Sequence, residues 1–372
     1  MMCFGILQSE RKYLYRWNRE SIGIQRSFIQ DNDFIGPTNY KTMMLLTLIL
    51  IIIISFPFVV VLTINQSYNK IGKSFSTGKA ILENSLSSKI SIHFIIDRLS
   101  KIFTKKRTFA EGVQTVDFME HIHSVKLDIP EWKGDGLYEV TAQTKEGTMH
   151  PAFLVYHWHA DSADTIIFNH GAFEYPFDRT FRHLFKKNNL KNLQVNLIIV
   201  RMPFHQQKGE LKKGIVTLSK FMATMAASTQ LTEEILKMVK NKGAKKVEVA
   251  GLSLGGVIAN RHHVIFDSAD YYVPIIAGSA HEKLFIHRNA TTQKEIERNR
   301  IITQNLNFTA EWNSIHTDNV FPVAARYDDY CRLYEQGPSY GNCPIEIWNL
   351  GHLTTTLSHK ALQYVLLRPF IQ

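Results

Sequence analysis

One serine in the sequence lies in a local pattern that can turn a hydroxyl group into a nucleophile. Ser253 occupies the centre of a G-x-S-x-G motif at residues 251–255. The apolar run at 246–250 predicts a strand that leads into the motif, and residues 256–266 predict a helix directly after it. So sharp a turn strains the serine backbone, and its glycines let neighbouring chains approach without a Cβ clash. The turn therefore presents the Ser253 hydroxyl at a helix N-terminus, where free backbone N–H groups can stabilise an anion.

This strand, turn and helix resemble the nucleophile elbow of the α/β-hydrolase superfamily, and the resemblance covers residues 120–372. It implies a triad in the chain order serine, acid, histidine. In that triad His352 removes the proton of Ser253, and Asp328 orients the imidazole and stabilises its charged form. An acyl-enzyme forms and is hydrolysed by water, so the resemblance implies that no cofactor is required.

The acid and the histidine are chosen by their places in this chain order. His352 follows the last predicted strand, whereas His359 is predicted to lie on the outer face of the final helix. Two adjacent carboxylates, Asp328 and Asp329, follow the strand before that. The superfamily spacing favours Asp328, and Asp329 remains the alternative because one inserted residue in the turn would shift the register.

The resemblance also indicates where an oxyanion hole would form. A strand predicted at 165–169 is followed by His170, Gly171 and Ala172, similar to the His-Gly oxyanion turn of lipases and esterases. The backbone N–H groups of Ala172 and Leu254 are the implied donors. For His170 a structural role, tying this loop to its neighbours, is favoured over a direct one.

The elements that must position these residues predict an α/β fold. Short apolar runs alternate with helical stretches from about residue 120, as expected for a mostly parallel sheet flanked by helices. A polar, helix-prone insertion at about 281–317 is predicted to form a small cap. Strands are predicted at 123–127, 138–143, 152–157, 165–169, 196–200, 246–250, 272–277, 320–325 and 345–348, and helices at 181–186, 217–240, 255–266 and 356–367.

Metal and nucleotide chemistry have weaker support. His121 and His123, like His157 and His159, would put two imidazoles on one face of a strand, but no carboxylate motif completes either pair. No G-x-G-x-x-G opens a helix. We therefore predict neither a metal nor a cofactor.

The N-terminal region has the character of a membrane anchor. Residues 43–62 are almost wholly apolar and uncharged, long enough to cross a bilayer as a helix. We predict a tail at 1–42 and a single transmembrane anchor at 43–65. A cleaved signal peptide is disfavoured because about forty residues precede the apolar run, although translation from Met43 would revive it. The side of the membrane stays open.

The positive charge is concentrated after this segment. The formal net charge is +10, and residues 42–110 carry nine Lys/Arg against two Asp/Glu, whereas 111–372 carry 28 against 27. Residues 66–119 are therefore predicted to be a basic amphipathic linker, lying on an anionic membrane surface or covering the soluble domain. The nearly neutral remainder excludes nucleic acid as a partner.

Cys331 and Cys343 lie on either side of the loop between the acid and the histidine. In an oxidising compartment we expect them to form a disulfide. The glycosylation sequons at Asn289 and Asn307 would be usable on that same side.

Together these features predict a membrane-anchored serine hydrolase that cleaves a carboxylic ester, with a lipid or another small acyl molecule as substrate. A peptidase or a thioesterase would use the same triad. A catalytically silent, membrane-tethered binding module is the alternative from another class, but its usual signature, a lost triad member, is absent here.

Overall fold

A computed structural model describes residues 44, 47, 67–83, 91–104 and 108–371. The predicted tail at 1–42 and, apart from Met44 and Thr47, the predicted transmembrane anchor at 43–65 lie outside these residues. Within the described part of the chain, no helix combines the length and the apolar character needed to cross a bilayer.

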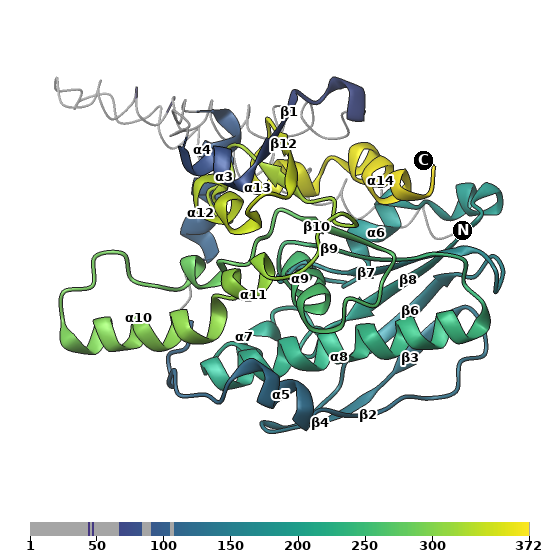
Figure 1. Cartoon of the computed structure of the whole chain (residues 1–372), viewed down its shortest axis with the longest axis horizontal. Helices are drawn as coiled ribbons and strands as arrows, with labels where there is room; N and C mark the ends of the chain where they lie inside the picture. Colours follow the sequence, from purple (N-terminus) through teal and green to yellow (C-terminus); the bar gives the residue numbers. More distant parts are fainter. Residues whose placement is uncertain (1–43, 45–46, 48–66, 84–90, 105–107, 372) are drawn as a thin grey trace, which may run out of the picture. The chain divides into compact units, whose positions relative to one another are not determined.

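The centre of the fold is a nine-stranded sheet with the order β1-β12-β11-β10-β9-β7-β8-β6-β3 (Figure 1). The six strands from β12 to β8 run parallel, while β1, β6 and β3 pair antiparallel at the two edges. This arrangement confirms the predicted α/β class. The strands are β1 (Lys73–Thr77), β3 (Gly136–Glu139), β6 (Ala152–His157), β7 (Asp164–Asn169), β8 (Val195–Arg201), β9 (Val247–Leu252), β10 (Tyr271–Ile275), β11 (Val323–Ala325) and β12 (Pro344–Trp348).

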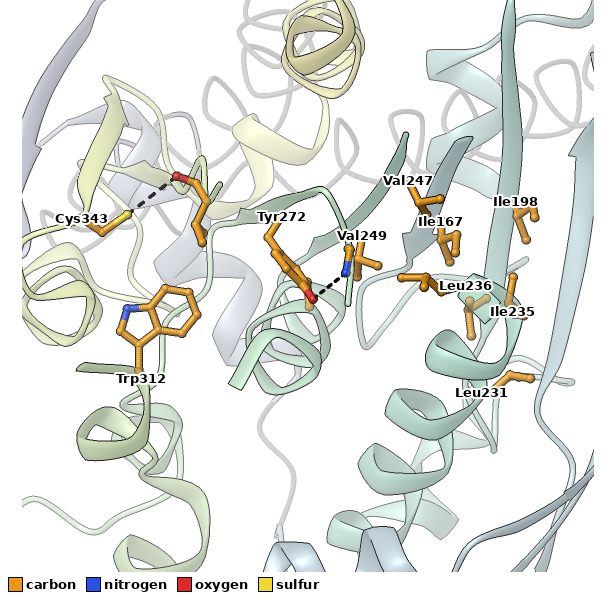
Figure 2. Packing of buried hydrophobic residues seen from close by; sticks show 14 of the residues in the cluster. Ile167, Ile198, Leu231, Ile235, Leu236, Val247, Val249, Tyr272, Trp312 and Cys343 are labelled. Carbon is orange, nitrogen blue, oxygen red and sulfur yellow. Dashed lines mark hydrogen bonds between the residues drawn. The ribbon is translucent and has the colours of Figure 1, made fainter. Parts of the chain in front are cut away.

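One face of the sheet is covered by the long helix α8 (Leu218–Lys242). Leu231 and Ile235 of this helix belong to the same buried cluster as Ile167 and Ile198 of the central strands (Figure 2). The opposite face is covered by α6 (Arg179–Leu184) and α14 (His359–Leu367), whose apolar side chains pack with the alternate strand residues Ile166 and Ile199. Because successive strand residues face opposite sides, both sides of these strands must be apolar, which explains their continuous apolar runs.

The strand order reverses around β7, and this places the site. β8 lies on one side of β7 and β9 on the other, all three parallel. At such a switch point the loops after neighbouring strands diverge and leave a crevice at the carboxyl ends. The predicted oxyanion turn follows β7, and the G-x-S-x-G turn follows β9, so both meet at this edge of the sheet.

Two predicted strands before β6 differ from the structure. The first, at 123–127, is largely replaced by the helix α5 (Phe118–Ser124), because the Asp117 side chain accepts the N–H of Glu120 and caps a helix there. Only the short β2 (Lys126–Asp128) follows it.

The second, at 138–143, is divided at Val140, whose N–H donates to Pro151 O. Its first half is β3 of the main sheet. Its second half is β4 (Thr141–Thr144), which joins β2 and β5 (Gly147–Met149) in a separate three-stranded sheet.

The segment predicted as a basic linker at 66–119 contributes to the folded domain. It contains β1, α3 (Gly78–Glu83) and α4 (Ile92–Thr104), and β1 pairs with β12 along its whole length. Ile96 and Asp97 of α4 are buried. The domain therefore begins well before residue 120, the boundary predicted from the sequence.

The predicted cap at 281–317 lies between β10 and β11. It consists of η3 (His281–Leu284), α10 (Gln293–Leu306) and α11 (Thr309–Asn313). Thr292 and Glu295 form a reciprocal capping box at the start of α10. Ile302 and Leu306, on the apolar side of α10, belong to the same buried cluster as Leu254, so the insertion packs beside the turn that carries Ser253.

Candidate active site

Ser253 stands between β9 and α9 (Leu254–Phe266) in a strained backbone conformation. Its φ is 56° and its ψ is −116°, a region that residues with a side chain rarely adopt. The Ser253 N–H donates to Ile275 O at 2.9 Å, which ties the turn to the neighbouring strand. The surrounding packing therefore holds the strain, and the half-buried Ser253 side chain projects from the turn.

The two glycines of the motif are required by close backbone contacts. A Cβ on Gly251 would lie 2.1 Å from Gly255 O, and a Cβ on Gly255 would lie 2.0 Å from Asn169 O. The first contact allows the turn to close on itself. The second lets the end of β7 lie directly against the turn, which brings the predicted oxyanion segment to Ser253.

His352 begins the short helix α13 (His352–Thr356) and connects Ser253 to Asp328. His352 Nε2 lies 3.0 Å from Ser253 Oγ, and His352 Nδ1 lies 2.7 Å from Asp328 Oδ2. Because an ionised carboxylate can only accept, Nδ1 carries the proton. Nε2 is then free to accept the proton of the serine hydroxyl, as a general base must.

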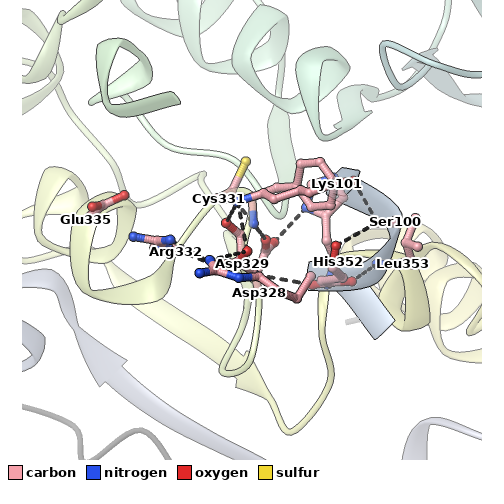
Figure 3. Close-up of polar contacts among 12 residues, drawn as sticks. Ser100, Lys101, Asp328, Asp329, Cys331, Arg332, Glu335, His352 and Leu353 are labelled. Atoms are coloured by element: carbon pink, nitrogen blue, oxygen red, sulfur yellow. Dashed lines mark hydrogen bonds and ion pairs between the residues drawn. The ribbon is translucent and has the colours of Figure 1, made fainter. Parts of the chain in front are cut away.

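The two adjacent carboxylates have different surroundings (Figure 3). Asp328 Oδ1 accepts the N–H groups of Tyr330 and Cys331, both at 2.7 Å, and leaves Oδ2 for His352. The buried Asp329 carboxylate instead forms an ion cluster with Arg98, Lys101 and Arg332 at 3.4, 3.0 and 2.9 Å. In the structure Asp328 therefore contacts the histidine, whereas Asp329 pairs with basic side chains.

The charge of Asp328 dominates the electrostatics of His352. Burial disfavours the imidazolium, but the Asp328 carboxylate and its hydrogen bond outweigh that effect and raise the pKa of His352 well above its usual value. An imidazole in this environment accepts a proton readily and stays stable once charged. The pKa of Asp329 is held below its usual value, because Lys101 and Arg332 outweigh the effect of its burial.

The predicted oxyanion turn lies beside the serine. A Cβ on Gly171 would come within 3.9 Å of Ser253 Cβ. The buried His170 donates from Nδ1 to Gly171 O at 2.7 Å and accepts the N–H of Met202 at Nε2 at 3.2 Å. These contacts agree with the structural role predicted for His170. Burial keeps the pKa of His170 well below its usual value, so the ring is neutral and holds this one tautomer.

The two implied donors flank the serine from different elements. Leu254 is the first residue of α9, where a backbone N–H has no intrahelical acceptor. The Ala172 N–H belongs to the peptide whose carbonyl His170 holds. The loop is also tied by His205, which contacts Ala172 O from Nε2 at 2.8 Å and stands 4.4 Å from the His170 ring. The sequence pattern contained no signal for His205.

Three of the other histidines considered in the sequence lie in other contacts. His121 and His123 lie on the helix α5, not on one face of a strand as predicted. His359 stacks on His183, with the ring centroids 4.9 Å apart. Of the described residues, only Asp328, Cys331 and His352 bring three metal-binding side chains within reach of one another. The acid and the base of that group already hydrogen-bond to each other.

The disulfide expected for an oxidising compartment is not formed in this structure, in which Cys331 and Cys343 are both free and buried. The N–H of Cys331 donates to Asp328 beside the histidine (Figure 3). Cys343 belongs instead to the hydrophobic cluster on one face of the sheet, where its Sγ lies 3.8 Å from Val320 O (Figure 2). The two thiols therefore lie in different surroundings, Cys331 beside the acid and Cys343 in the hydrophobic core.

Ser253 lies on a strained turn after a central parallel strand, and hydrogen bonds connect it to a histidine and an acid at the ends of later strands. This arrangement on a mostly parallel sheet identifies the fold. The chain has the α/β-hydrolase fold. Solved structures with a similar α/β-hydrolase fold include acetyl xylan esterase 1 from Thermoanaerobacterium sp. JW/SL YS485, with 13% identity, a TM-score of 0.45, and 68% of this chain and 96% of that chain covered. An acetyl xylan esterase from Paenibacillus sp. R4 has 10% identity and a TM-score of 0.43, covering 71% of this chain and 90% of that one.

A Pyrococcus furiosus esterase matches this α/β-hydrolase chain at 14% identity and a TM-score of 0.42, covering 65% of this chain and 97% of the other. No protein-family model matches the sequence, and no curated protein matches it either.

Proposed function

We propose that this protein is a serine hydrolase that cleaves a carboxylic ester through an acyl-enzyme on Ser253. The observation that carries the proposal is the continuous hydrogen-bond chain from Ser253 Oγ through His352 to Asp328, with heavy-atom distances of 3.0 and 2.7 Å. These distances lie within the range that proton transfer to a general base requires.

The chemical steps follow from the assigned protons. His352 Nε2 accepts the Ser253 proton as Oγ attacks the ester carbonyl carbon, and the N–H groups of Ala172 and Leu254 stabilise the oxyanion. His352 then gives that proton to the leaving alcohol, and the acyl group stays on Oγ. His352 then deprotonates a water molecule, which attacks the carbonyl carbon of the acyl-enzyme. As the bond to Ser253 Oγ breaks and the carboxylic acid leaves, His352 returns the proton to Ser253.

Apolar side chains beside the oxyanion turn support an apolar substrate. Phe173 directly follows Ala172 and is 62% exposed, and Tyr175 is 41% exposed. Behind the turn, Leu254 is buried in a cluster of aromatic and aliphatic side chains against which Ala172 also packs. Aromatic and aliphatic surface at this position favours an acyl chain or another apolar ester over a strongly charged substrate.

Attachment to a membrane is the second part of the proposal. Its support is the uncharged, almost wholly apolar run at 43–62. If this segment is an anchor, the full chain remains in the membrane fraction after extraction with alkaline carbonate and is released by detergent. Release by carbonate alone would contradict the anchor and leave the proposed hydrolase untouched.

The decisive experiment for the chemistry is labelling with a fluorophosphonate probe. An activated serine forms a covalent bond to the probe phosphorus and expels fluoride, whatever the natural ester is. We expect the wild-type protein to be labelled and Ser253→Ala to be unlabelled, whereas Ser314→Ala, a change at an exposed serine that only caps α11, should react like wild type. Equal labelling of Ser253→Ala would refute the assignment.

A further inference from the structure

The catalytic histidine begins a helix that has no side-chain cap of its own. The residue before His352 is Gly351, which has no side chain with which to accept the first backbone N–H groups of α13. Asp97 of α4 supplies the acceptors. Its Oδ2 accepts the His352 N–H at 2.6 Å, and its Oδ1 accepts the Leu353 N–H at 3.0 Å.

The same carboxylate also reaches the loop that carries the acid. Asp97 Oδ2 accepts the N–H of Asp329, the residue next to Asp328, at 3.2 Å. Asp97 is fully buried, so these three N–H groups would lose their acceptors without it. One side chain therefore ties together the two loops whose separation sets the contact between Asp328 and His352.

Other side chains of α4 contact the same loops (Figure 3). Lys101 Nζ lies 3.0 Å from the Asp329 carboxylate. Ser100 Oγ lies 2.7 Å from the hydroxyl of Tyr330, whose ring is 4.9 Å from the ring of His352. A Cβ on residue 351 would lie 2.8 Å from Asp97 Oδ2, so the glycine there is what permits the helix to approach.

We propose that Asp97 is a positioning residue for the acid and the histidine, and that α4 is thereby a working part of the active site. The inference rests on the proposed function, because it assigns Asp97 a role through Asp328 and His352. It gives α4, which was predicted from the sequence to belong to a linker, an effect on the rate of catalysis. Loss of the contact would let His352 move relative to Ser253 Oγ, and displacements of about 1 Å cost up to ~10²-fold in rate.

The test compares Asp97→Asn with the wild-type protein. Both carboxylate oxygens of Asp97 accept backbone N–H groups, so an amide NH₂ must face a donor in either orientation. We expect kcat for a p-nitrophenyl ester to fall at least about tenfold with KM within about twofold. The second-order rate of fluorophosphonate labelling should fall in parallel, and Asp97→Glu, which retains a carboxylate, should lie between Asn and wild type.

The matched control is Asp117→Asn. Asp117 caps α5 by accepting the Glu120 N–H at 2.8 Å. The Asp117→Asn substitution therefore makes the same chemical change at the start of a helix outside the site. Its kcat should equal that of wild type. All rates are taken at a temperature where circular dichroism shows the variants folded, so that a loss of activity reports geometry and not unfolding.

The outcomes separate the two proposals. A labelled wild type together with a folded Asp97→Asn that keeps its kcat would overturn the positioning role and leave the hydrolase intact. An unlabelled wild type would overturn the proposed function itself. If Asp97→Asn does not fold, Lys101→Met replaces it, because it weakens the hold of α4 on Asp329 while keeping Asp97. A severalfold lower kcat then supports the proposal, and an unchanged kcat overturns it.

Discussion

His170 donates a hydrogen bond from Nδ1 to the carbonyl oxygen of Gly171, 2.7 Å away, and so sets the plane of the peptide that ends in the Ala172 N–H. A trans peptide is planar, with its N–H pointing opposite to its C=O, so holding the oxygen fixes the direction of the donor. The Met202 N–H holds the other side of the ring.

We therefore expect His170→Ala to lower kcat more than it changes KM. The donor direction matters most when the oxyanion forms, and loss of one oxyanion donor costs about 10²- to 10³-fold in kcat. A partial loss of about tenfold to 100-fold fits a donor that is present but poorly aimed. Steady-state kinetics with a soluble ester measures both constants, and a pure rise in KM would contradict this role.

The adjacent carboxylates give a second prediction. Asp328→Asn should lower kcat by about 10³- to 10⁴-fold, because an amide can no longer hold the imidazole with its proton on Nδ1. Asp329→Asn keeps that contact and alters only the ion cluster with Arg98, Lys101 and Arg332. It should cost far less. Comparable small losses in both variants, measured as kcat/KM, would mean that the acid lies elsewhere.

The pH dependence of catalysis follows from the raised pKa of His352. Only the neutral imidazole can act as a base, so activity is lost as the pH falls through the pKa of His352. Because Asp328 raises this pKa, the acidic limb of kcat/KM should lie above about pH 6.5, the ordinary value for histidine. A pH profile of ester hydrolysis from 5 to 9 tests this, and a flat rate over that range would rule out His352 as the base.

Gly255→Ala should destabilise the fold strongly. The new Cβ would meet the backbone oxygen of Asn169 at 2.0 Å, and neither chain can move without shifting β7 or α9. We expect a loss of more than about 2 kcal/mol in the free energy of unfolding. Gly209→Ala is the comparison, since its φ is 78° but no atom lies within 4 Å. It should cost about 1 kcal/mol, for the left-handed backbone alone. Urea titration of both variants measures the difference.

The free thiols give a prediction that replaces the expected disulfide. Non-reducing mass mapping should find Cys331 and Cys343 unlinked, and a reducing agent should leave ester hydrolysis unchanged. Burial raises the pKa of both thiols, that of Cys343 to about 12, so neither forms a thiolate readily at neutral pH. Detection of a linked Cys331–Cys343 peptide pair would contradict this prediction and indicate that the domain lies in an oxidising compartment.

Much of this architecture is encoded locally. The elbow could be identified from the sequence because a G-x-S-x-G between an apolar strand and a helix is a short-range pattern, and its glycines are demanded by contacts within and beside the turn. The strands β6 to β10 could be predicted because burial on both faces makes them continuously apolar. The strand predicted at 138–143 could not be predicted as two separate strands, because its division at Val140 depends on which sheet each half joins.

The tertiary structure decided what depends on partners distant in the chain. The sequence favoured Asp328 but kept the adjacent Asp329 as an alternative, and only the ion pairs of Asp329 with α4 and Arg332 show which carboxylate is left for His352. Asp97 looked like one acid in a basic run, yet it accepts a hydrogen bond from His352, a residue 255 positions later. Periodicity shows which side chains are buried, but a buried polar group takes its role from the chain that folds against it. The sequence by itself therefore predicted Ser253 as the candidate nucleophile and determined the α/β class, whereas tertiary packing decided which carboxylate contacts His352, where the two thiols lie and how α4 contacts the site.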